Sequence, residues 1–270
     1  MPRVLALMAH PDDIEITCAG TLLLLKDAGW DVHLATMTAG DLGSAILGPA
    51  AISRVRRREA AAAAALLGAE YTCLGFKDLT ITYGERAKRL ISGLLRAVRP
   101  DLLVTHPPRD YMADHEETCR IAREAAFCST IPNWTATPVP AAARRPARRR
   151  AAPQPPCDRM PVVLYADPID LVDHAGGRAP AQLLVDISAV IERKAAMLAA
   201  HASQREWLRA QHGEDEYLDW MRRSGAARAK QFGKRSVTHA EGFVMHRGHG
   251  FPHDDLITPA LGKSRVKTVA

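Results

Sequence analysis

Few cysteines and no long apolar run occur in this sequence. The five cysteines are an odd number, are widely spaced and form no C-x-x-C pair, which excludes a disulfide scaffold and gives no sign of a zinc ribbon or redox dithiol. No segment approaches the roughly 20 apolar residues that span a membrane as a helix. The apolar run Val4–Ala9 is too short for a signal peptide and has no small-residue cleavage site. We therefore expect a cytoplasmic protein with no membrane partner.

A glycine-rich phosphate-binding turn is also missing. The first apolar run leads into His10-Pro11-Asp12-Asp13, whereas a dinucleotide-binding module carries G-x-G-x-x-G at this point to admit a pyrophosphate. A nucleotide-binding Rossmann module is therefore disfavoured.

The chain has the composition of an ordinary globular protein. Its 270 residues are 47% hydrophobic and 24% charged, enough to bury a core without disulfide support. Lysine and arginine number 36 against 30 aspartate and glutamate, which gives a formal net charge of +6. That charge fits the steering of an acidic ligand but identifies none. We expect residues 1–270 to form one domain.

Apolar strand-like runs alternate with helical patterns over the first half of the chain. The expected strands are Val4–Ala9, Val32–Thr38, Tyr71–Phe76 and Leu102–His106. The expected helices are Glu15–Ala28, Ile52–Leu67 and Arg86–Val98. Parallel neighbours need long crossovers, so this alternation predicts an α/β protein with a Rossmann-like, mostly parallel sheet and helices on both faces.

A change of composition separates this half from the rest. Residues 135–157 are rich in proline, alanine and arginine, which cannot fill a core, so we predict a disordered loop there. A C-terminal α+β extension is expected to follow. Its elements are strands at Val162–Ala166, Leu183–Ile187 and Phe243–His246, and helices at Ser188–Arg209 and Glu214–Arg228.

The arginine-rich run Arg144–Arg150 lies within the predicted loop. It could bind nucleic acid through phosphate contacts. A solvated linker is the favoured interpretation, because no aromatic residue is interleaved with the arginines to stack on bases.

Chemically active side chains follow three of the expected strands. In a doubly wound sheet, ligands bind outside the carboxyl ends of the strands, where the strand order reverses. Those ends carry His10-Pro11-Asp12-Asp13, Thr38-Ala39-Gly40-Asp41, and a segment leading through His106 to Asp114-His115. The first and fourth strands are neighbours in the usual order, so residues 10, 13 and 115 can converge.

Convergence of His10, Asp13 and His115 would produce a catalytic zinc shell. Two imidazoles and a carboxylate leave a fourth position open, and zinc there lowers the pKa of bound water toward ~7. Asp12 would remain free to act as general base. The alternative for each motif is a helix cap, in which the aspartates bind backbone N–H groups and no metal is involved.

Several motifs together resemble the PIG-L/LmbE family of zinc-dependent N-deacetylases, most strongly over residues 3–128. They are Ala9-His10-Pro11-Asp12-Asp13, Gly20-Thr21, Thr38-Ala39-Gly40-Asp41, Arg56 with Glu59, Leu67-Gly68 and Asp114-His115. The resemblance implies a Rossmann-like fold, Zn²⁺ bound by His10, Asp13 and His115, and Asp12 as general base. It further implies removal of an N-acyl group, typically acetyl, from a 2-acetamido sugar or glycoside, with Arg56 holding substrate or the catalytic carboxylate, and a homo-oligomer.

One departure from the family pattern concerns the oxyanion. Many members have His-Pro-Asp-His where this chain has Met112-Ala113-Asp114-His115, so one expected donor is missing. Tyr111, His106 or His246 could replace it, and we rank His246 first. The loss of such a donor would cost roughly 3 kcal/mol of barrier.

Three other side chains receive roles around this site. We expect Asp114 to orient a ligand or relay histidine, and we group Asp41 with the substrate contacts. Trp220 could stack on a sugar, but its position on a helix favours burial in the core.

Two other functional classes remain open. A zinc amidohydrolase acting on a non-sugar amide would share the mechanism, and a panel of sugar and acyl-amino-acid substrates would separate the two. A basic nucleic-acid-binding protein using the arginine run would show binding that weakens steeply with salt and survives chelation.

Overall fold

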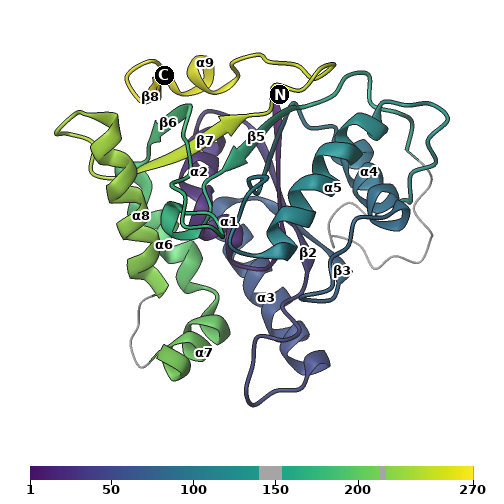
Figure 1. The fold of residues 1–270 in the computed structure, drawn as a ribbon, viewed down its shortest axis with the longest axis horizontal. Helices are drawn as coiled ribbons and strands as arrows, with labels where there is room; N and C mark the ends of the chain where they lie inside the picture. The colour runs from purple at the N-terminus through teal and green to yellow at the C-terminus, as the bar shows by residue number, and fades with distance from the viewer. Residues whose placement is uncertain (140–153, 213–216, 270) are drawn as a thin grey trace.

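The computed structural model describes residues 1–139, 154–212 and 217–269. Within them, one eight-stranded sheet has the order β3-β2-β1-β4-β5-β7-β6-β8 (Figure 1). Its strands are β1 (Arg3–Met8), β2 (Asp31–Thr38), β3 (Glu70–Phe76), β4 (Leu102–Thr105), β5 (Val162–Ala166), β6 (Leu183–Asp186), β7 (Ala240–Met245) and β8 (Val266–Thr268). The α/β class predicted from the alternating pattern is confirmed.

The sheet is parallel over its first five strands and antiparallel at its far edge. Strands β1 to β5 pair in parallel, whereas β7 runs antiparallel to both β5 and β6, and β8 antiparallel to β6. The strand order reverses between β1 and β4, which are neighbours as expected. The carboxyl ends of these two strands therefore form the crevice where a ligand binds in such sheets.

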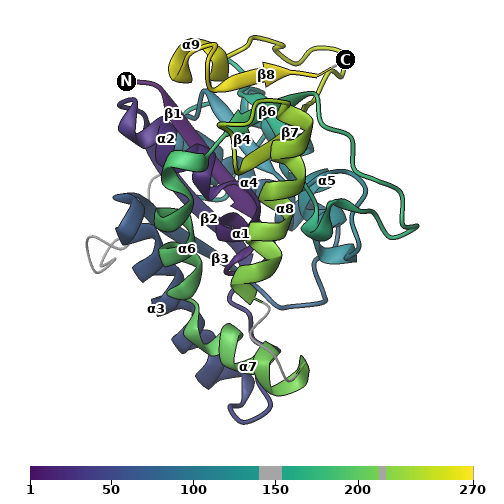
Figure 2. The same cartoon turned by 90° about the vertical axis from the view of Figure 1, so that its left-hand side faces the viewer.

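Helices cover both faces of the sheet (Figure 2). They are α1 (Asp13–Thr17), α2 (Ala19–Asp27), α3 (Pro49–Leu67), α4 (Glu85–Val98), α5 (Ala113–Ser129), α6 (Ile191–Ala199), α7 (Ala202–His212), α8 (Tyr217–Phe232) and α9 (Ile257–Leu261). Alternate side chains of β1 point to opposite faces. Val4 and Met8 join a core cluster with α2, α6 and α8, while Leu5 and Leu7 join one with α4 and α5.

The helix predicted over Glu15–Ala28 is in fact two helices. Cys18 leaves the helical conformation at φ −139° and ψ 1°. The first N–H groups of the second helix, which have no partner within it, then meet a buried carboxylate, because Gly20 and Thr21 donate to Glu241 at 2.8 and 2.7 Å. The prediction of one continuous helix is wrong, since the group that starts α2 lies on β7.

The long helix predicted over Ser188–Arg209 is also divided. A short 3₁₀ turn precedes α6, and α7 starts afresh after it. Ser203 in the first turn of α7 donates through its N–H and its hydroxyl to Glu59, at 2.9 and 2.6 Å. The break buries His201 completely, 3.3 Å from Glu15. A distant carboxylate again sets the helix boundary.

Other boundaries differ in the C-terminal part. Helix α9 and strand β8 were not predicted, and the described part of the helix expected at Glu214–Arg228 begins at Tyr217 and ends at Phe232. Most of the loop predicted at 135–157, the arginine run included, lies outside the described residues. Among the helices of the described ranges, none combines the length and apolarity that a bilayer crossing requires.

Candidate active site

Three buried side chains from two separate parts of the chain meet beside the ends of β1 and β4. His10 follows β1, Asp13 opens α1, and His115 lies in the first turn of α5. His10 Nδ1 lies 3.3 Å from His115 Nε2, and Asp13 lies 3.4 Å from the first ring and 3.5 Å from the second. One ligand atom from each residue falls within 4.8 Å of the others. This is the convergence that the strand-end argument predicted.

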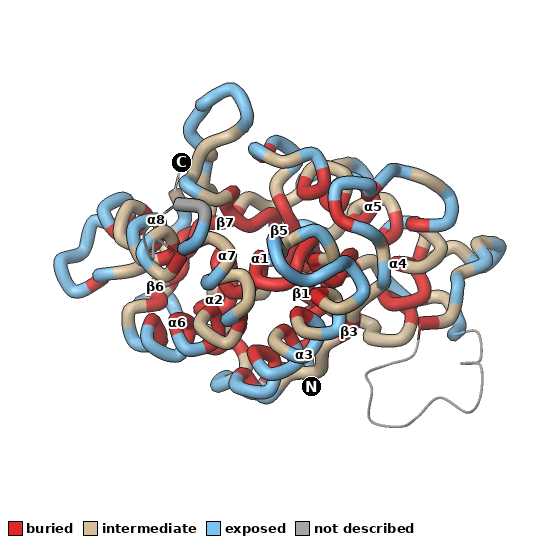
Figure 3. The backbone as a smooth tube through the Cα atoms, turned by 90° about the horizontal axis from the view of Figure 1, so that it is seen from below, coloured by how far each residue is buried: buried red, intermediate tan, exposed pale blue. Residues whose placement is uncertain are grey.

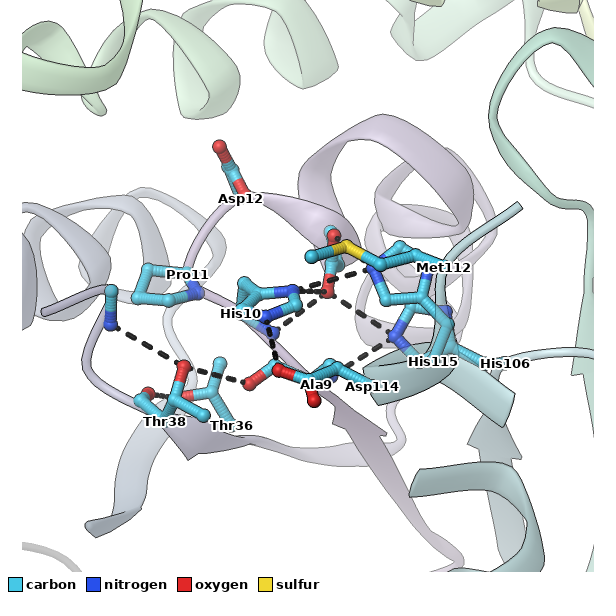
Figure 4. Close-up of polar contacts among 12 residues, drawn as sticks. Ala9, His10, Pro11, Asp12, Thr36, Thr38, His106, Met112, Asp114 and His115 are labelled. Atoms are coloured by element: carbon cyan, nitrogen blue, oxygen red, sulfur yellow. Dashed lines mark hydrogen bonds and ion pairs between the residues drawn. The ribbon is translucent and has the colours of Figure 1, made fainter. Parts of the chain in front are cut away.

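The turn after β1 creates this arrangement. Asp12 has a positive φ of 100°, a conformation that is uncommon outside glycine and is often found at functional sites. The turn is closed by the His10 N–H, which donates to Asp13 Oδ2 at 2.7 Å. Adjacent aspartates consequently diverge, and in Figure 4 the Asp12 carboxylate points away from the histidine cluster.

Each candidate histidine ligand is oriented by a second carboxylate. His10 Nε2 lies 3.1 Å from Asp114 Oδ2, and His115 Nδ1 lies 2.9 Å from Asp110 Oδ1. Asp114 is itself held by the N–H groups of Leu79 and Ile81 at 2.7 and 3.3 Å. When one ring nitrogen donates to a carboxylate, the other presents a lone pair, which is the usual arrangement of metal-binding histidines.

The charge balance also fits a cation. Burial disfavours the charged form of His10, yet its hydrogen bonds with Asp114 and Asp13 raise the pKa of this histidine to about 10. Coulombic interaction with His115 and His106 overcomes burial and holds the pKa of Asp13 well below its usual value. Positive charge in this cluster therefore stabilises the buried carboxylates. The donor set of two imidazoles and one carboxylate suits a divalent metal.

His106 supports this cluster from behind. Its ring stacks on His115 with centroids 3.8 Å apart and planes 12° apart, and its Nε2 lies 3.2 Å from Asp13. A second possible ligand group consists of His106, Asp110 and His115. In that group Asp110, which orients His115 through Nδ1, would have to act as a ligand itself, so the first group is the better metal site. His106 Nε2 also accepts the Ala9 N–H at 3.0 Å, and the residue is 1% exposed. These contacts make His106 a weaker candidate for the oxyanion donor.

Asp12 lies outside the three-residue cluster and has its own partners. Its Oδ2 accepts from the Tyr217 hydroxyl at 2.7 Å and lies 3.4 Å from Arg56 Nη2. Arg56 also donates to the Pro11 carbonyl at 2.9 Å. Burial raises the pKa of Asp12, and the positive charge of Arg56 opposes that shift. The sequence could not indicate Tyr217, which belongs to no local motif and lies on α8.

A cavity of about 250 Å³ opens over these groups. Its polar lining consists of His10, Asp12, Asp13, Arg56, Asp78, Gln204 and Tyr217, and its apolar lining of Ile16, Leu42, Leu79, Tyr111, Met112, Ile169, Leu208 and Trp220, with Gly43 between. Trp220 is half-buried at this cavity, so the expectation that it is a core residue is wrong.

Arg56 and Tyr111 both reach the cavity as predicted. The Arg56 guanidinium lies over Gly40 and Gly43, where added Cβ atoms would collide with it. Tyr111 sets its ring edge-on to His115, with centroids 5.3 Å apart. Met112 lies beside them at the cavity wall and offers no hydrogen-bond donor.

Two residues predicted to contact substrate lie outside the cavity lining. His246 does not line the cavity, because β7 runs antiparallel and carries this residue beside Val163, toward the other end of the sheet, where it bonds to Tyr165 at 2.8 Å. Asp41 also lies outside the lining. It accepts the Asp78 N–H at 2.8 Å and so fixes the loop after β3 instead of contacting a ligand.

Fold and site together describe a Rossmann-like protein with a candidate metal centre at the switch point of its sheet. Seen from the end where β1 finishes, the backbone around β1 and α1 is buried, and exposed loops surround it (Figure 3). A reaction here would take place in a partly enclosed pocket with a free carboxylate at its side.

Comparison with known proteins identifies the family. The family model of PIG-L, described as GlcNAc-PI de-N-acetylase, matches residues 5–126. The 1D-myo-inositol 2-acetamido-2-deoxy-alpha-D-glucopyranoside deacetylase of Nakamurella multipartita is 30% identical over 241 residues, covering 76% of this chain and 80% of that protein. The chain belongs to the PIG-L/LmbE family.

Solved structures confirm the fold. The N,N'-diacetylchitobiose deacetylase of Pyrococcus horikoshii aligns with a TM-score of 0.71 at 23% identity, over 94% of this chain and 88% of that one. The 4-carboxy-2-hydroxymuconate hydratase of Pseudomonas putida aligns with a TM-score of 0.73 at 20% identity, over 95% and 100%. One fold thus carries two reaction types, so the reaction must be argued from the site.

Proposed function

We propose that this protein is a zinc-dependent hydrolase that removes an N-acyl group, acetyl in the simplest case, from a 2-acetamido sugar or glycoside. The observation that carries the proposal is a buried His10–Asp13–His115 cluster with an adjacent carboxylate, Asp12, left outside it in the same cavity. The deacetylase names of the relatives support the substrate class.

Zn²⁺ would be held by His10, Asp13 and His115, with Asp114 and Asp110 fixing the two rings. When bound, the metal supplies Lewis acidity, which polarises the acyl carbonyl and acidifies water. The protein's part is to present three ligand atoms that already face one another.

Asp12 is proposed as the general base and acid. One of its oxygens is held by Tyr217 and lies beside Arg56, so the carboxylate keeps a fixed orientation at the cavity. It would take a proton from the attacking water and then return that proton to the departing nitrogen, giving free amine and carboxylic acid. Burial raises its pKa, which suits a group that must exchange protons near neutral pH.

Tyr111 is proposed as the oxyanion donor that replaces the histidine missing at position 112. Of the three candidates from the sequence, it is the one that lines the cavity. Its hydroxyl could donate to the acyl oxygen as negative charge develops there.

The test is a substrate panel with zinc-loaded protein. N-acetylglucosamine glycosides, N-acetyl amino acids and an unsaturated hydroxy-tricarboxylate are incubated separately, and released amine or loss of a double bond is measured. We expect amine from the glycosides and none after chelation. Exclusive cleavage of the amino-acid amides would favour the non-sugar alternative. Hydration without deacylation would place the chain with the hydratase relative and overturn the proposal.

A further inference from the structure

The cavity mouth is apolar, although its floor is charged. Among the described residues, nine large hydrophobic side chains are exposed, and three of them, Leu42, Leu79 and Tyr111, line this one cavity. They are 50%, 64% and 51% exposed. Ligand contact is one of the usual reasons for such a concentration of exposed apolar surface.

Half-buried apolar residues continue this surface inward. Ile169, Leu208 and Trp220 line the same cavity. We define the six residues of the apolar collar as Leu42, Leu79, Tyr111, Ile169, Leu208 and Trp220. They come from four loops or turns and two helices, so the collar draws on six separate segments and does not form a stripe on one element.

The charges of the lining lie below this collar. Among its described residues Arg56 is the one arginine or lysine, and it is buried against Asp12 and the Pro11 carbonyl. Asp13 and Asp78 add negative charge to the floor. Away from the proposed zinc on the floor, a negatively charged substituent in the collar would therefore meet carboxylates and no unpaired arginine or lysine of the described lining. Burial of an apolar substituent is favourable.

We propose that the apolar collar binds an apolar substituent of the substrate, an alkyl or aryl group carried either on the acyl carbon or on the glycosidic oxygen. This inference rests on the proposed function, because it names the substrate class of the same site. The continuity of the collar with the cavity that holds Asp12 makes substrate its occupant, and not a separate partner.

The first experiment compares matched substrates with the zinc-loaded full chain. The set contains methyl, octyl and carboxymethyl N-acetylglucosaminides and methyl N-octanoylglucosaminide, and kcat/KM is measured from released amine. We expect the octyl or the octanoyl compound to exceed the methyl N-acetyl compound at least about tenfold, the scale of apolar pocket discrimination. The compound with the higher kcat/KM shows whether the collar binds the glycosidic or the acyl substituent. The carboxymethyl compound should gain nothing.

Variants assign the preference to the collar. Leu79→Asn suits the positive φ of 60° at this residue, and Leu42→Gln keeps side-chain length. In the double variant the kcat/KM ratio of the favoured eight-carbon substrate, octyl or octanoyl, to the methyl N-acetyl compound should fall toward one. Leu66→Gln is the matched control, because this leucine is 57% exposed on α3 and lies outside the cavity lining. It should keep the wild-type ratio.

Calorimetry separates failure of this inference from failure of the proposed function. If the rates place the collar on the glycosidic side, octyl glucosaminide, which has no acyl group to lose, should bind more tightly than methyl glucosaminide. If they place it on the acyl side, octanoate should bind more tightly than acetate. Equal rates and equal binding across the set overturn the collar and leave the deacetylase intact. Binding preference without hydrolysis of any N-acylglucosaminide overturns the deacetylase and supports the collar. If the double variant changes the mass of the oligomer but not the kcat/KM ratio of long-chain to methyl substrate, the collar is a subunit contact and the inference is overturned.

Discussion

At position 12 an aspartate occupies a strained turn that glycine would adopt more easily, and it is buried as well. The strain directs its carboxylate toward Tyr217 and Arg56, while the next residue turns toward the histidines. Neighbouring carboxylates can therefore take different tasks, one as ligand and one as base.

Replacement of Asp12 tests this division. In Asp12→Asn the amide oxygen can still accept from Tyr217, so we expect zinc content to be unchanged while kcat falls about 10²- to 10⁴-fold, the usual contribution of a general base. His115→Ala should instead lose zinc. Metal analysis and amine release measure both. An Asp12→Asn protein of full activity would refute the base assignment.

Removal of the hydroxyl should lower kcat by different amounts at the two tyrosines of the cavity. Tyr111→Phe removes the proposed oxyanion donor, so we expect kcat to fall about 10²-fold with little change in KM. Tyr217→Phe should lower kcat less, because Arg56 still lies beside Asp12. Steady-state kinetics on one glycoside compares them. Equal losses would contradict the separate roles, and an unchanged Tyr111→Phe would remove Tyr111 from the mechanism.

Some residues of the site could be predicted from the sequence because they follow strands, and others could not. His10, Asp13 and His115 follow strands, and the rule for strand ends brings them together without coordinates. Asp110 and Tyr217 could not be assigned this way, because their roles depend on which ring nitrogen or carboxylate oxygen they meet in three dimensions.

At the level of elements, the start of α2 depends on a buried ion pair. Glu241 on β7 accepts from two N–H groups of α2 and from Lys194 Nζ at 2.6 Å, and both charged side chains are 3% exposed. Three elements distant in the sequence are joined at this point.

Glu241→Gln should be strongly destabilising. It leaves Lys194 charged and buried, so we expect a loss of roughly 3–5 kcal/mol in the free energy of unfolding. Arg193→Gln, which breaks an exposed pair with Asp27, should cost about 1 kcal/mol or less. Urea denaturation compares the two. Similar small losses in both would show that the buried pair is not needed for stability.

Periodicity predicted elements better than it predicted their ends. Strands β1 to β5 were placed within one residue at either end, since each is a short apolar run between turn signals. The breaks before α2 and α7 were missed because Glu241 and Glu59 supply the caps from elsewhere in the chain. The hydrophobic periodicity of the sequence continues through each break, so it predicts one long helix.

For the molecule as a whole, metal binding should couple to stability, because the three proposed ligands join the first strand to α5. With zinc at 100 times its dissociation constant, stabilisation should reach about 2.7 kcal/mol, or roughly 5–10 °C in Tm for a chain of this size. Chelation should reverse it. Scanning calorimetry of wild type, Asp12→Asn and His115→Ala checks this: the first two should respond to zinc and the third should not. A zinc response retained by His115→Ala would place the ion elsewhere.

Helix α8 contributes both Tyr217 and Trp220, although it lies far outside the segment that carries the metal ligands and Arg56. Evolution could therefore alter what the enzyme accepts by changing Trp220 and its neighbours on this late helix, provided that Tyr217 is kept to hold Asp12. A chimera that takes the rest of α8 from a relative and retains Tyr217 should acquire the substrate preference of that relative.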